Sequence, residues 1–376
     1  MSLRILVVDD SALYRQLVKN VLRNVPDVQV VGLACTGMEA VAKISELQPD
    51  LLTLDVQMPD MNGLELLREI KNRQLGVKAI MISSLTAHGA QVTTDALLAG
   101  AFDFIQKPNS PDAETNRKLL QELLFEKINA FQESRSTTMP VRKQASALSR
   151  SIASKERVTD VKPWIDTAGT VSKPDSASLR SGSGHIDAVV IGTSTGGPLA
   201  LREIIPKLPS TLGVPVFVVQ HMPQGYTKSL AARIGEMSQL PVQEAANSMI
   251  VEPNQVYVAP GGLHMGIEVQ RGKHWISTSD SPPEHNCRPS VDYTLRSVAK
   301  AYAGRLLVVI LTGMGRDGTE GCRLVRQLGG SVLAQHPDGC VVYGMPKAVV
   351  EEQLANRVVP LEKMATWIVR MLEASR

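Results

Sequence analysis

The chain has 376 residues, of which 43% are hydrophobic and 4% aromatic, and its formal net charge is +3. At about 150 residues per domain, this length predicts two domains with some chain to spare. We expect neither a membrane span nor a signal peptide, because no apolar run is long enough for either. The four cysteines lie far apart without a CxxC pair, which argues against a disulfide framework or a zinc site and favours a reducing cytoplasm.

Charge divides the chain into three parts. Residues 1–133 carry 13 Lys and Arg against 17 Asp and Glu, residues 134–185 carry 9 against 4, and residues 186–376 carry 18 against 16. The basic middle part is rich in Ser and Thr and has no apolar periodicity, so it cannot bury enough surface to offset the entropy of ordering it. We therefore predict two domains, 1–133 and 186–376, joined by a flexible basic linker over 134–185. Its dispersed charges and single aromatic residue argue against binding of nucleic acid.

Five short apolar runs alternate with amphipathic segments in the first domain. Each run predicts a buried strand, and each amphipathic segment a helix. Five such units predict a parallel, doubly wound sheet with helices on both faces and right-handed connections. The runs cover residues 3–8, 28–33, 50–54, 78–82 and 102–105.

Polar residues follow these strands at the sheet edge where folds of this kind place their chemistry. Asp9, Asp10 and Asp55 would meet there, with Ser83 and Lys107 beside them. Three carboxylates repel one another unless cations compensate, and hard oxygen ligands with open positions suit Mg²⁺. An aspartate can then attack phosphorus as a covalent nucleophile, while Lys107 pairs with the phosphoryl group and Ser83 hydrogen-bonds to it.

These side chains belong to a larger joint pattern: Asp9-Asp10, Asp55 with Met58-Pro59 and Asn62-Gly63, Ser83, and Lys107-Pro108. The pattern resembles the receiver domain of two-component response regulators, from residue 1 to about residue 125. The resemblance implies that Asp55 is the phospho-acceptor, that Asp10 is a metal ligand, and that the Lys107-Pro108 bond is cis. The aromatic residue that the family carries on its fifth strand would be Phe102 or Phe104.

In the second domain, an apolar run over 186–191 leads into the loop 192–198, Gly-Thr-Ser-Thr-Gly-Gly-Pro, and then into a helical stretch. A dinucleotide fingerprint would need Gly at position 194, and a P-loop would need a following Gly-Lys-Ser/Thr. The pattern Gly192-x-Ser194-x-Gly196 between strand and helix instead matches a nucleophile elbow. Without further support, a structural turn with a capping Ser or Thr would explain this loop as well.

Two more strand ends support catalysis. The run 214–220 leads into His221, and the run 306–311 leads into a glycine-rich loop that contains Asp317. Parallel strands end at one edge of a sheet, so Ser194, His221 and Asp317 can converge there. In serine hydrolysis the serine attacks an acyl carbon, the histidine takes its proton and later protonates the leaving group, and the aspartate orients the imidazole. The chain order Ser…His…Asp argues against an ordinary α/β-hydrolase.

Other groups fit around this predicted triad. The tetrahedral intermediate needs donors for its oxyanion, and the amide of Thr195 and the loop that holds Met314 are candidates. His264, His285 and His336 are weaker candidates for the base, and one of them could line the substrate cleft.

Six motifs extend the pattern over the second domain: Gly192–Gly197, His221-Met222-Pro223, Ala259–Gly262, Arg288–Asp292, Leu311–Gly318 and Tyr343–Pro346. With them, the chain resembles the chemotaxis protein-glutamate methylesterases (CheB) over both domains, with only the linker unmatched. The resemblance implies hydrolysis of γ-glutamyl methyl esters on chemoreceptors and deamidation of some receptor glutamines. It also implies phosphorylation of Asp55 by the chemotaxis histidine kinase, and a receiver that hinders access to the catalytic site.

The same resemblance implies Mg²⁺ for receiver phosphorylation only, no cofactor for the esterase step, and a cytoplasmic protein recruited to chemoreceptor arrays. Two residues depart from the family pattern. Cys287 stands where His is frequent, and either lines the cleft or is a packed thiol. Tyr226 stands where Phe is frequent.

Three alternatives remain open. A DNA-binding response regulator would need a basic recognition helix, which the second domain lacks. A phosphorylation-dependent binding module with a lapsed esterase is disfavoured by the presence of Ser194, His221 and Asp317. The same chemistry could also act on receptors of a non-flagellar, chemosensory-like pathway.

Overall fold

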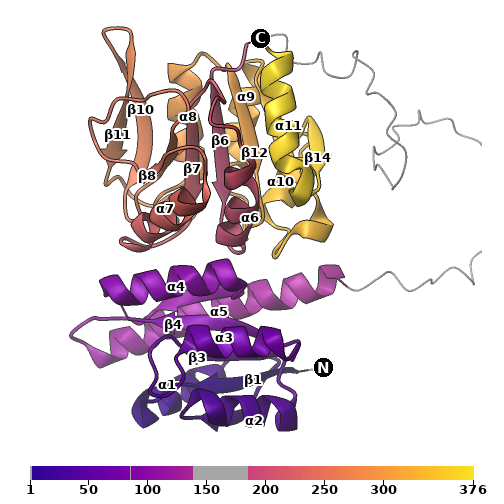
Figure 1. Ribbon diagram of the computed structural model, residues 1–376. Helices are drawn as coiled ribbons and strands as arrows, with labels where there is room; N and C mark the ends of the chain where they lie inside the picture. The colour runs from indigo at the N-terminus through magenta and orange to yellow at the C-terminus, as the bar shows by residue number, and fades with distance from the viewer. Residues whose placement is uncertain (1, 85, 139–184) are drawn as a thin grey trace, which may run out of the picture.

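The computed structural model describes residues 2–84, 86–138 and 185–376. They form two α/β units that lie against each other, the N-terminal one in indigo to magenta and the C-terminal one in dark red through orange to yellow (Figure 1). Most of the predicted linker over 134–185 lies outside the described residues, so its flexibility stays a prediction.

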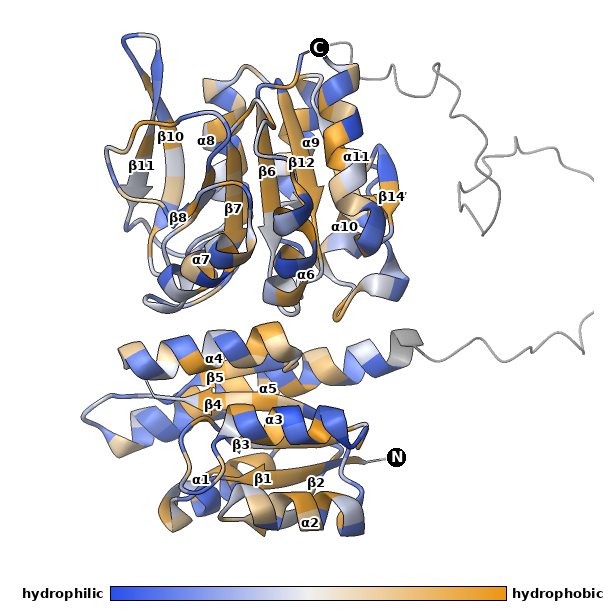
Figure 2. Ribbon diagram, in the orientation of Figure 1, coloured by the Kyte–Doolittle hydropathy of each residue, from blue (hydrophilic) through white to orange (hydrophobic). Residues whose placement is uncertain are grey.

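The N-terminal unit contains the predicted five-stranded parallel sheet, in the order β2-β1-β3-β4-β5. Apolar side chains alternate between its two faces, so that α1 and α5 cover one face and α2, α3 and α4 cover the other. The strands are the hydrophobic centre of the unit, and the helices are hydrophilic on their outer sides (Figure 2). The elements are β1 (Leu3–Val8), α1 (Ala12–Leu22), β2 (Val28–Ala34), α2 (Gly37–Leu47), β3 (Leu51–Asp55), α3 (Gly63–Asn72), β4 (Lys78–Ser83), α4 (Ala87–Ala99), β5 (Asp103–Gln106) and α5 (Ala113–Thr138).

The C-terminal unit contains a seven-stranded parallel sheet, in the order β14-β13-β12-β6-β7-β9-β8, and an antiparallel hairpin of β10 and β11. Helices α6, α7 and α11 cover one face of the sheet, and α8, α9 and α10 cover the other. The elements are β6 (Ala188–Thr193), α6 (Gly197–Ile204), β7 (Val216–Gln220), α7 (Tyr226–Met237), β8 (Val242–Glu244), β9 (Val256–Val258), β10 (His264–Gln270), β11 (Lys273–Ser279), α8 (Val291–Ala301), β12 (Leu306–Ile310), α9 (Thr319–Gln327), β13 (Ser331–Gln335), α10 (Met345–Glu351), β14 (Arg357–Val359) and α11 (Leu361–Ala374).

The middle of this sheet positions the predicted catalytic residues. Strand β6 pairs with β12 on one side and with β7 on the other, and Thr193 is the register partner of Gln220. Ser194 therefore follows the central strand and His221 follows its neighbour. Asp317 lies in the loop after β12, so three adjacent strands deliver the three residues to one edge.

The two units meet through α4, which contacts α6 and α7 (Figure 1). Leu97 and Leu98 of α4 and Phe104 of β5 share one buried cluster with Leu201 and Tyr226 of the C-terminal unit. This apolar contact places the receiver-like unit against the same end of the C-terminal sheet that carries Ser194.

Polar contacts join the same surfaces. Arg233 of α7 forms an ion pair with Asp95 of α4, at 2.8 Å between Nε and Oδ1. Arg202 of α6 donates to the carbonyl oxygen of Leu98, at 2.5 Å. The interface thus combines a hydrophobic centre with an ion pair between α4 and α7 and a hydrogen bond between α4 and α6.

Two features differ from the sequence-based expectations. Helix α5 continues to Thr138, into the segment predicted as linker, and Arg135 near its end forms an ion pair with Asp50 at 2.9 Å. The Lys107-Pro108 bond is trans, and the cis bond among the described residues is Arg288-Pro289. The expectation of a cis Lys107-Pro108 bond was wrong, since Lys107 reaches its carboxylate partners with the trans form, which is the lower-energy isomer of X-Pro bonds.

Within the described parts of the chain, no helix is both long enough and apolar enough to cross a membrane.

Candidate functional site

The first candidate site is an acidic group at the carboxyl edge of the N-terminal sheet. Asp9 and Asp10 follow β1 and Asp55 ends β3, and one carboxylate oxygen from each lies within 4.8 Å of the others. Lys107, just after β5, places Nζ 3.1 Å from Asp9 and 2.8 Å from Asp55. The structure thus brings together four of the five residues that the sequence assigned to this edge.

The charges in this group are unbalanced. Burial raises the pKa of Asp55 to about 6, with help from the negative charge of Asp9 and against the effect of Lys107. Burial alone would lower the pKa of Lys107, but the carboxylates of Asp55 and Asp9 outweigh it and raise that pKa, so the ammonium stays charged. Three carboxylates around one ammonium leave a negative excess of hard oxygen ligands. Asp9, Asp10 and Asp55 therefore fit a Mg²⁺ ion.

Ser83 does not point at the acidic group. Its hydroxyl accepts a hydrogen bond from Thr93 Oγ1 at 2.8 Å and lies 3.4 Å from the carbonyl oxygen of Gly89. For Ser83 to hydrogen-bond a phosphoryl group on Asp55, as the sequence predicts, its side chain must leave these partners. That role stays a prediction.

The two candidate aromatic residues near β5 face different neighbours. The ring of Phe102 packs edge-on against Phe131 of α5, at 5.1 Å between centroids. The ring of Phe104 lies 4.6 Å from Tyr226 of the C-terminal unit. Phe104 is thus the aromatic side chain of this pair that reaches the other unit. The Tyr226 hydroxyl is buried there, near the side chain of Ser83, and burial raises its pKa.

The second candidate site begins at the turn between β6 and α6. Gly196 has φ of +81°, which favours glycine, and the amide of Gly197 donates to the carbonyl oxygen of Ser194 at 2.8 Å. Ser194 is held from the β12 side as well, because its amide donates to the carbonyl oxygen of Thr312 at 3.0 Å. A Cβ on Gly313 would lie 2.8 Å from that of Ser194, so this close approach requires glycine.

The Ser194 side chain is half-buried, and its hydroxyl makes no hydrogen bond with any part of the chain that the structure describes. The turn is therefore rigid in its backbone but leaves the hydroxyl free. Among the described residues, Ser194 Oγ makes no hydrogen bond to His221, whose two ring nitrogens contact Asp317 and Cys287, and attack on an ester requires the serine–histidine hydrogen bond to form.

His221 and Asp317 form a direct pair. His221 Nε2 donates to Asp317 Oδ2 at 2.8 Å, and the two side chains are 10% and 2% exposed. Asp317 also accepts from Ser290 Oγ and from the amides of Val291 and Asp292, at 2.7–2.9 Å. These two amides open helix α8, so the helix N-terminus holds the carboxylate in place.

The pair is strongly polarised. Burial would raise the pKa of Asp317, but the hydrogen bond and charge of His221, with the α8 amides, hold it below the usual range. Burial would likewise lower the pKa of His221, but its interactions with Asp317 and Cys287 outweigh burial and raise the pKa above that of a free histidine. An imidazole next to such a carboxylate is well suited to carry a positive charge during a reaction.

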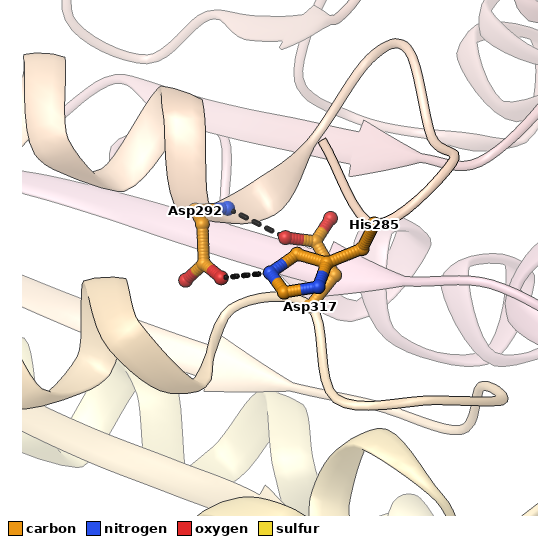
Figure 3. A group of neighbouring side chains, drawn as sticks. All are labelled: His285, Asp292 and Asp317. Atoms are coloured by element: carbon orange, nitrogen blue, oxygen red, sulfur yellow. Dashed lines mark hydrogen bonds and ion pairs between the residues drawn. The ribbon is translucent and has the colours of Figure 1, made fainter. Parts of the chain in front are cut away.

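A second buried carboxylate stands beside Asp317. Figure 3 shows that Asp292 contacts both neighbours, Asp317 through its backbone amide and the ring of His285 through its carboxylate. His285 Nε2 lies 3.1 Å from Asp292 Oδ2, while Asp292 Oδ1 accepts from the amide of Gly321 at 2.7 Å. Burial and the charge of Asp317 raise the pKa of Asp292. Because both oxygens of Asp317 already accept hydrogen bonds, we assign this group to support of Asp317 and not to a metal.

The contacts of Cys287 and His264 could not be predicted from the sequence. Cys287 places Sγ 3.4 Å from Nδ1 of His221, so it lies in the site, although the sequence left open whether it was a packed thiol. His264, a weaker candidate for the base in the sequence analysis, is buried and stacks on Tyr293 at 4.4 Å between ring centroids. Its Nδ1 accepts from the amide of Ser290, which makes it a structural residue. The departure of Cys287 from the family pattern was the only sequence signal for its position.

Of the two candidate oxyanion donors, Thr195 directly follows Ser194, and Met314 directly follows Gly313, which approaches Ser194 closely. Neither backbone amide donates a hydrogen bond to any described residue. The Thr195 hydroxyl, in contrast, donates to Oδ2 of Asp103 in the N-terminal unit at 2.5 Å. The residue next to Ser194 is therefore tied directly to the receiver-like unit.

Comparisons with known proteins agree with this arrangement. A family model described as response regulator receiver domain matches residues 5–119, and one described as CheB methylesterase matches residues 189–368. A relative from Thermotoga maritima is 42% identical over 370 residues, which cover 98% of each chain, and one from Desulfotalea psychrophila is 40% identical over 381 residues, covering 99% of each. Both are named protein-glutamate methylesterase/protein-glutamine glutaminase.

Among solved structures, the Thermotoga maritima CheB methylesterase catalytic domain is 46% identical, covers 50% of this chain and 98% of its own, and has a TM-score of 0.49. The full-length identity to the curated relatives decides the assignment. The chain belongs to the CheB family of protein-glutamate methylesterases/protein-glutamine glutaminases, with a response-regulator receiver domain at its N-terminus.

Proposed function

We propose that this chain is a phosphorylation-activated serine hydrolase that removes methyl groups from γ-glutamyl methyl esters of chemoreceptors and deamidates some receptor glutamines. The observation that carries the proposal is the His221–Asp317 pair beside the free hydroxyl of Ser194, at one edge of the C-terminal sheet. The names of the full-length relatives supply the substrate class.

The proposed ester step uses Ser194 as the nucleophile and His221 as the base. Ser194 Oγ attacks the γ-carbonyl carbon, and its proton passes to His221. The amides of Thr195 and Met314 donate to the oxyanion of the tetrahedral intermediate. The intermediate collapses, the C–O bond to the methoxy group breaks, and His221 returns the proton to release methanol. Water then hydrolyses the acyl-enzyme by the same route and leaves a glutamate. With a glutamine substrate, the group that leaves is ammonia.

His221, the proposed base, can accept the proton of Ser194 on only one of its two ring nitrogens. Nε2 of His221 is hydrogen-bonded to Asp317, so Nδ1 is the ring nitrogen that can accept the serine proton. The imidazole must be neutral for this step, and Asp317 raises its pKa. We therefore expect the esterase rate of the free enzyme to rise with pH, through an apparent pKa above the usual value of about 6.5 for histidine.

Asp55 is the phospho-acceptor in this proposal. A carboxylate oxygen of Asp55 attacks the phosphorus of a phosphohistidine on the chemotaxis kinase, and the P–N bond breaks. Lys107, which already touches Asp55 at 2.8 Å, pairs with the transferred group. Asp9, Asp10 and Asp55 would hold a Mg²⁺ ion, whose positive charge would offset that of the incoming phosphoryl oxygens.

The unphosphorylated receiver restricts the catalytic edge. Asp103 accepts from the hydroxyl of Thr195, and Val342 packs in the same buried cluster as Phe131 of α5. A receptor helix must reach Ser194 past these contacts. Phosphorylation adds about −1.5 to −2 charges beside Lys107 and draws Ser83 away from Thr93, which alters the α4–β5 surface that meets α6 and α7. The enzyme then works at chemoreceptor arrays in the cytoplasm.

The function is tested by release of volatile methanol from radiolabelled, methylated receptor membranes, with and without a small-molecule phosphodonor. We expect the phosphodonor to raise the rate by about 5–150-fold, which corresponds to a coupling free energy of roughly 1–3 kcal/mol. Asp55→Asn removes the nucleophilic oxygen but keeps the shape of the side chain. This variant should retain the basal rate and lose the stimulation.

Absence of methanol release under both conditions would contradict the esterase proposal. Equal stimulation of wild type and Asp55→Asn would instead show that Asp55 is not the phospho-acceptor, and it would not contradict the esterase proposal.

The Arg233–Asp95 ion pair provides a test of the interdomain restriction. Asp95→Arg places two guanidinium groups at the interface, and the repulsion should raise the basal esterase rate at least about 5-fold without a phosphodonor. Arg233→Asp alone should act in the same direction. The double variant restores opposite charges and should return the basal rate toward wild type, because the ion pair re-forms with the partners exchanged. If both single variants keep the wild-type basal rate, this surface does not restrict the enzyme.

A further inference from the structure

Cys287 lies in the segment between β11 and α8, directly beside the catalytic imidazole. Its Sγ is 3.4 Å from Nδ1 of His221, whose Nε2 is bound to Asp317 at 2.8 Å. The thiol is held there, because Cys287 and Glu284 exchange two backbone hydrogen bonds of 3.1 and 2.8 Å. Cys287 is partly exposed, unlike the fully buried Cys322.

These three side chains repeat the order of a cysteine nucleophile, a histidine base and an orienting carboxylate. A thiolate is the reactive form of cysteine, and an adjacent histidine that can accept the thiol proton favours it. Asp317 stabilises the resulting imidazolium, and the amides of Val291 and Asp292 hold Asp317 in turn. None of the other three cysteines has an imidazole partner: Cys35 is exposed beside Glu39, and burial raises the pKa of Cys340 to about 12.

The position of Cys287 also gives its modification a consequence. Asp317 occupies Nε2 of His221 and Cys287 contacts Nδ1, which is the nitrogen that the proposed mechanism needs for the proton of Ser194. Any group added to Sγ lies next to this nitrogen. It would block transfer of the serine proton there.

We propose that Cys287 is a reactive thiol that small electrophiles, including hydrogen peroxide, modify covalently, and that its modification switches off the esterase. With peroxide, Sγ attacks one oxygen, the O–O bond breaks and an S–O bond forms. The thiol proton leaves with the second oxygen as water, so that sulfur is oxidised to a sulfenic acid and the peroxide is reduced. With iodoacetamide, an S–C bond forms, iodide leaves and His221 takes the thiol proton.

The reactivity is tested in the full-length protein by limited treatment with iodoacetamide at neutral pH, followed by peptide mass spectrometry of each cysteine. We expect Cys287 to react at least about tenfold faster than the more exposed Cys35, which is the internal reference. His221→Gln keeps a polar side chain but removes the base, and should slow labelling of Cys287 at least about tenfold. Cys322, fully buried, should stay unlabelled and so reports that the variant is folded.

The consequence is tested by methanol release from methylated receptor membranes, so this second part rests on the proposed function. The lost fraction of activity should equal the labelled fraction of Cys287. Cys35→Ser, a change far from the site, should leave the rate of inactivation unchanged. Hydrogen peroxide should protect Cys287 from later labelling, and dithiothreitol should restore both labelling and activity.

Equal or slower labelling of Cys287 than of Cys35, or unchanged labelling of Cys287 in folded His221→Gln, would overturn the reactivity. Full labelling of Cys287 with undiminished methanol release would overturn the switch. An untreated protein that releases no methanol would refute the proposed esterase instead, and the labelling rates would still decide the reactivity of Cys287.

Discussion

Ser194→Ala is expected to lower the esterase rate by roughly 10⁴–10⁶-fold, because it removes the nucleophile from a site whose other parts remain. Neighbouring hydroxyl groups cannot replace it. Thr193 Oγ1 donates to the carbonyl oxygen of Thr312 at 2.9 Å, and Thr195 Oγ1 donates to Asp103. The measurement is methanol release from methylated receptor membranes at saturating substrate. Phosphorylation of Asp55 should be unchanged, since that site lies in the other domain.

Thr195→Val is the matched control for this prediction. It changes the adjacent residue, keeps its backbone amide, and removes only the hydrogen bond to Asp103. We expect it to keep the ester chemistry and to raise the basal rate, because it frees the turn from the receiver. If Ser194→Ala retains near wild-type methanol release, Ser194 is not the nucleophile. If that remaining activity is lost on adding Cys287→Ala, the thiol beside His221 would take its place.

The central strands of each sheet were predictable from the sequence because they are buried on both faces. Such strands appear as short, nearly continuous apolar runs, and the observed β1 and β12 end within a residue of the predicted runs. The end of α5 was not predictable in this way. Its last turns carry no apolar periodicity, and one of their partners is Asp50, which lies far away in the sequence.

The placement of Ser194, His221 and Asp317 at one edge also followed from strand order, since each follows a strand of one parallel sheet. The hydrogen bonds that hold these residues and their neighbours in place could not be predicted from strand order. Asp317 accepts hydrogen bonds from the start of α8, and Thr195 reaches Asp103 in the other domain. These contacts join loops that are distant in sequence, and only the packed structure brings them within hydrogen-bond distance. The catalytic roles of all three residues, and those of Thr195 and Met314, remain predictions until they are measured.

Asp317→Asn should reduce the esterase rate by about 10⁴-fold while keeping the fold, since it places the wrong group against His221. Asp317 uses Oδ1 for Ser290 Oγ and the Asp292 amide, and Oδ2 for His221 and the Val291 amide. An asparagine can keep its oxygen on one of these sides only. If the oxygen stays with Ser290, the NH₂ group faces Nε2 of His221, and the imidazole must then accept there and carry its proton on Nδ1. Nδ1 can no longer take the proton of Ser194.

Asp292→Asn separates this effect from the loss of a buried charge. Asp292 is as buried as Asp317 and hydrogen-bonds the amide of Gly321, but it does not touch His221. We expect it to change the esterase rate less than about tenfold, while the two variants lose similar stability, roughly 1–3 kcal/mol each from one impaired buried hydrogen-bond set. Thermal unfolding and methanol release on the same preparations give both quantities. A loss of activity in Asp292→Asn as large as in Asp317→Asn would mean that the charge of the cluster, and not the orientation of His221, sustains catalysis. Because Asp292 lies against the carboxylate that holds the imidazole, this comparison tests the orienting role of Asp317 more directly than any substitution of His221 itself.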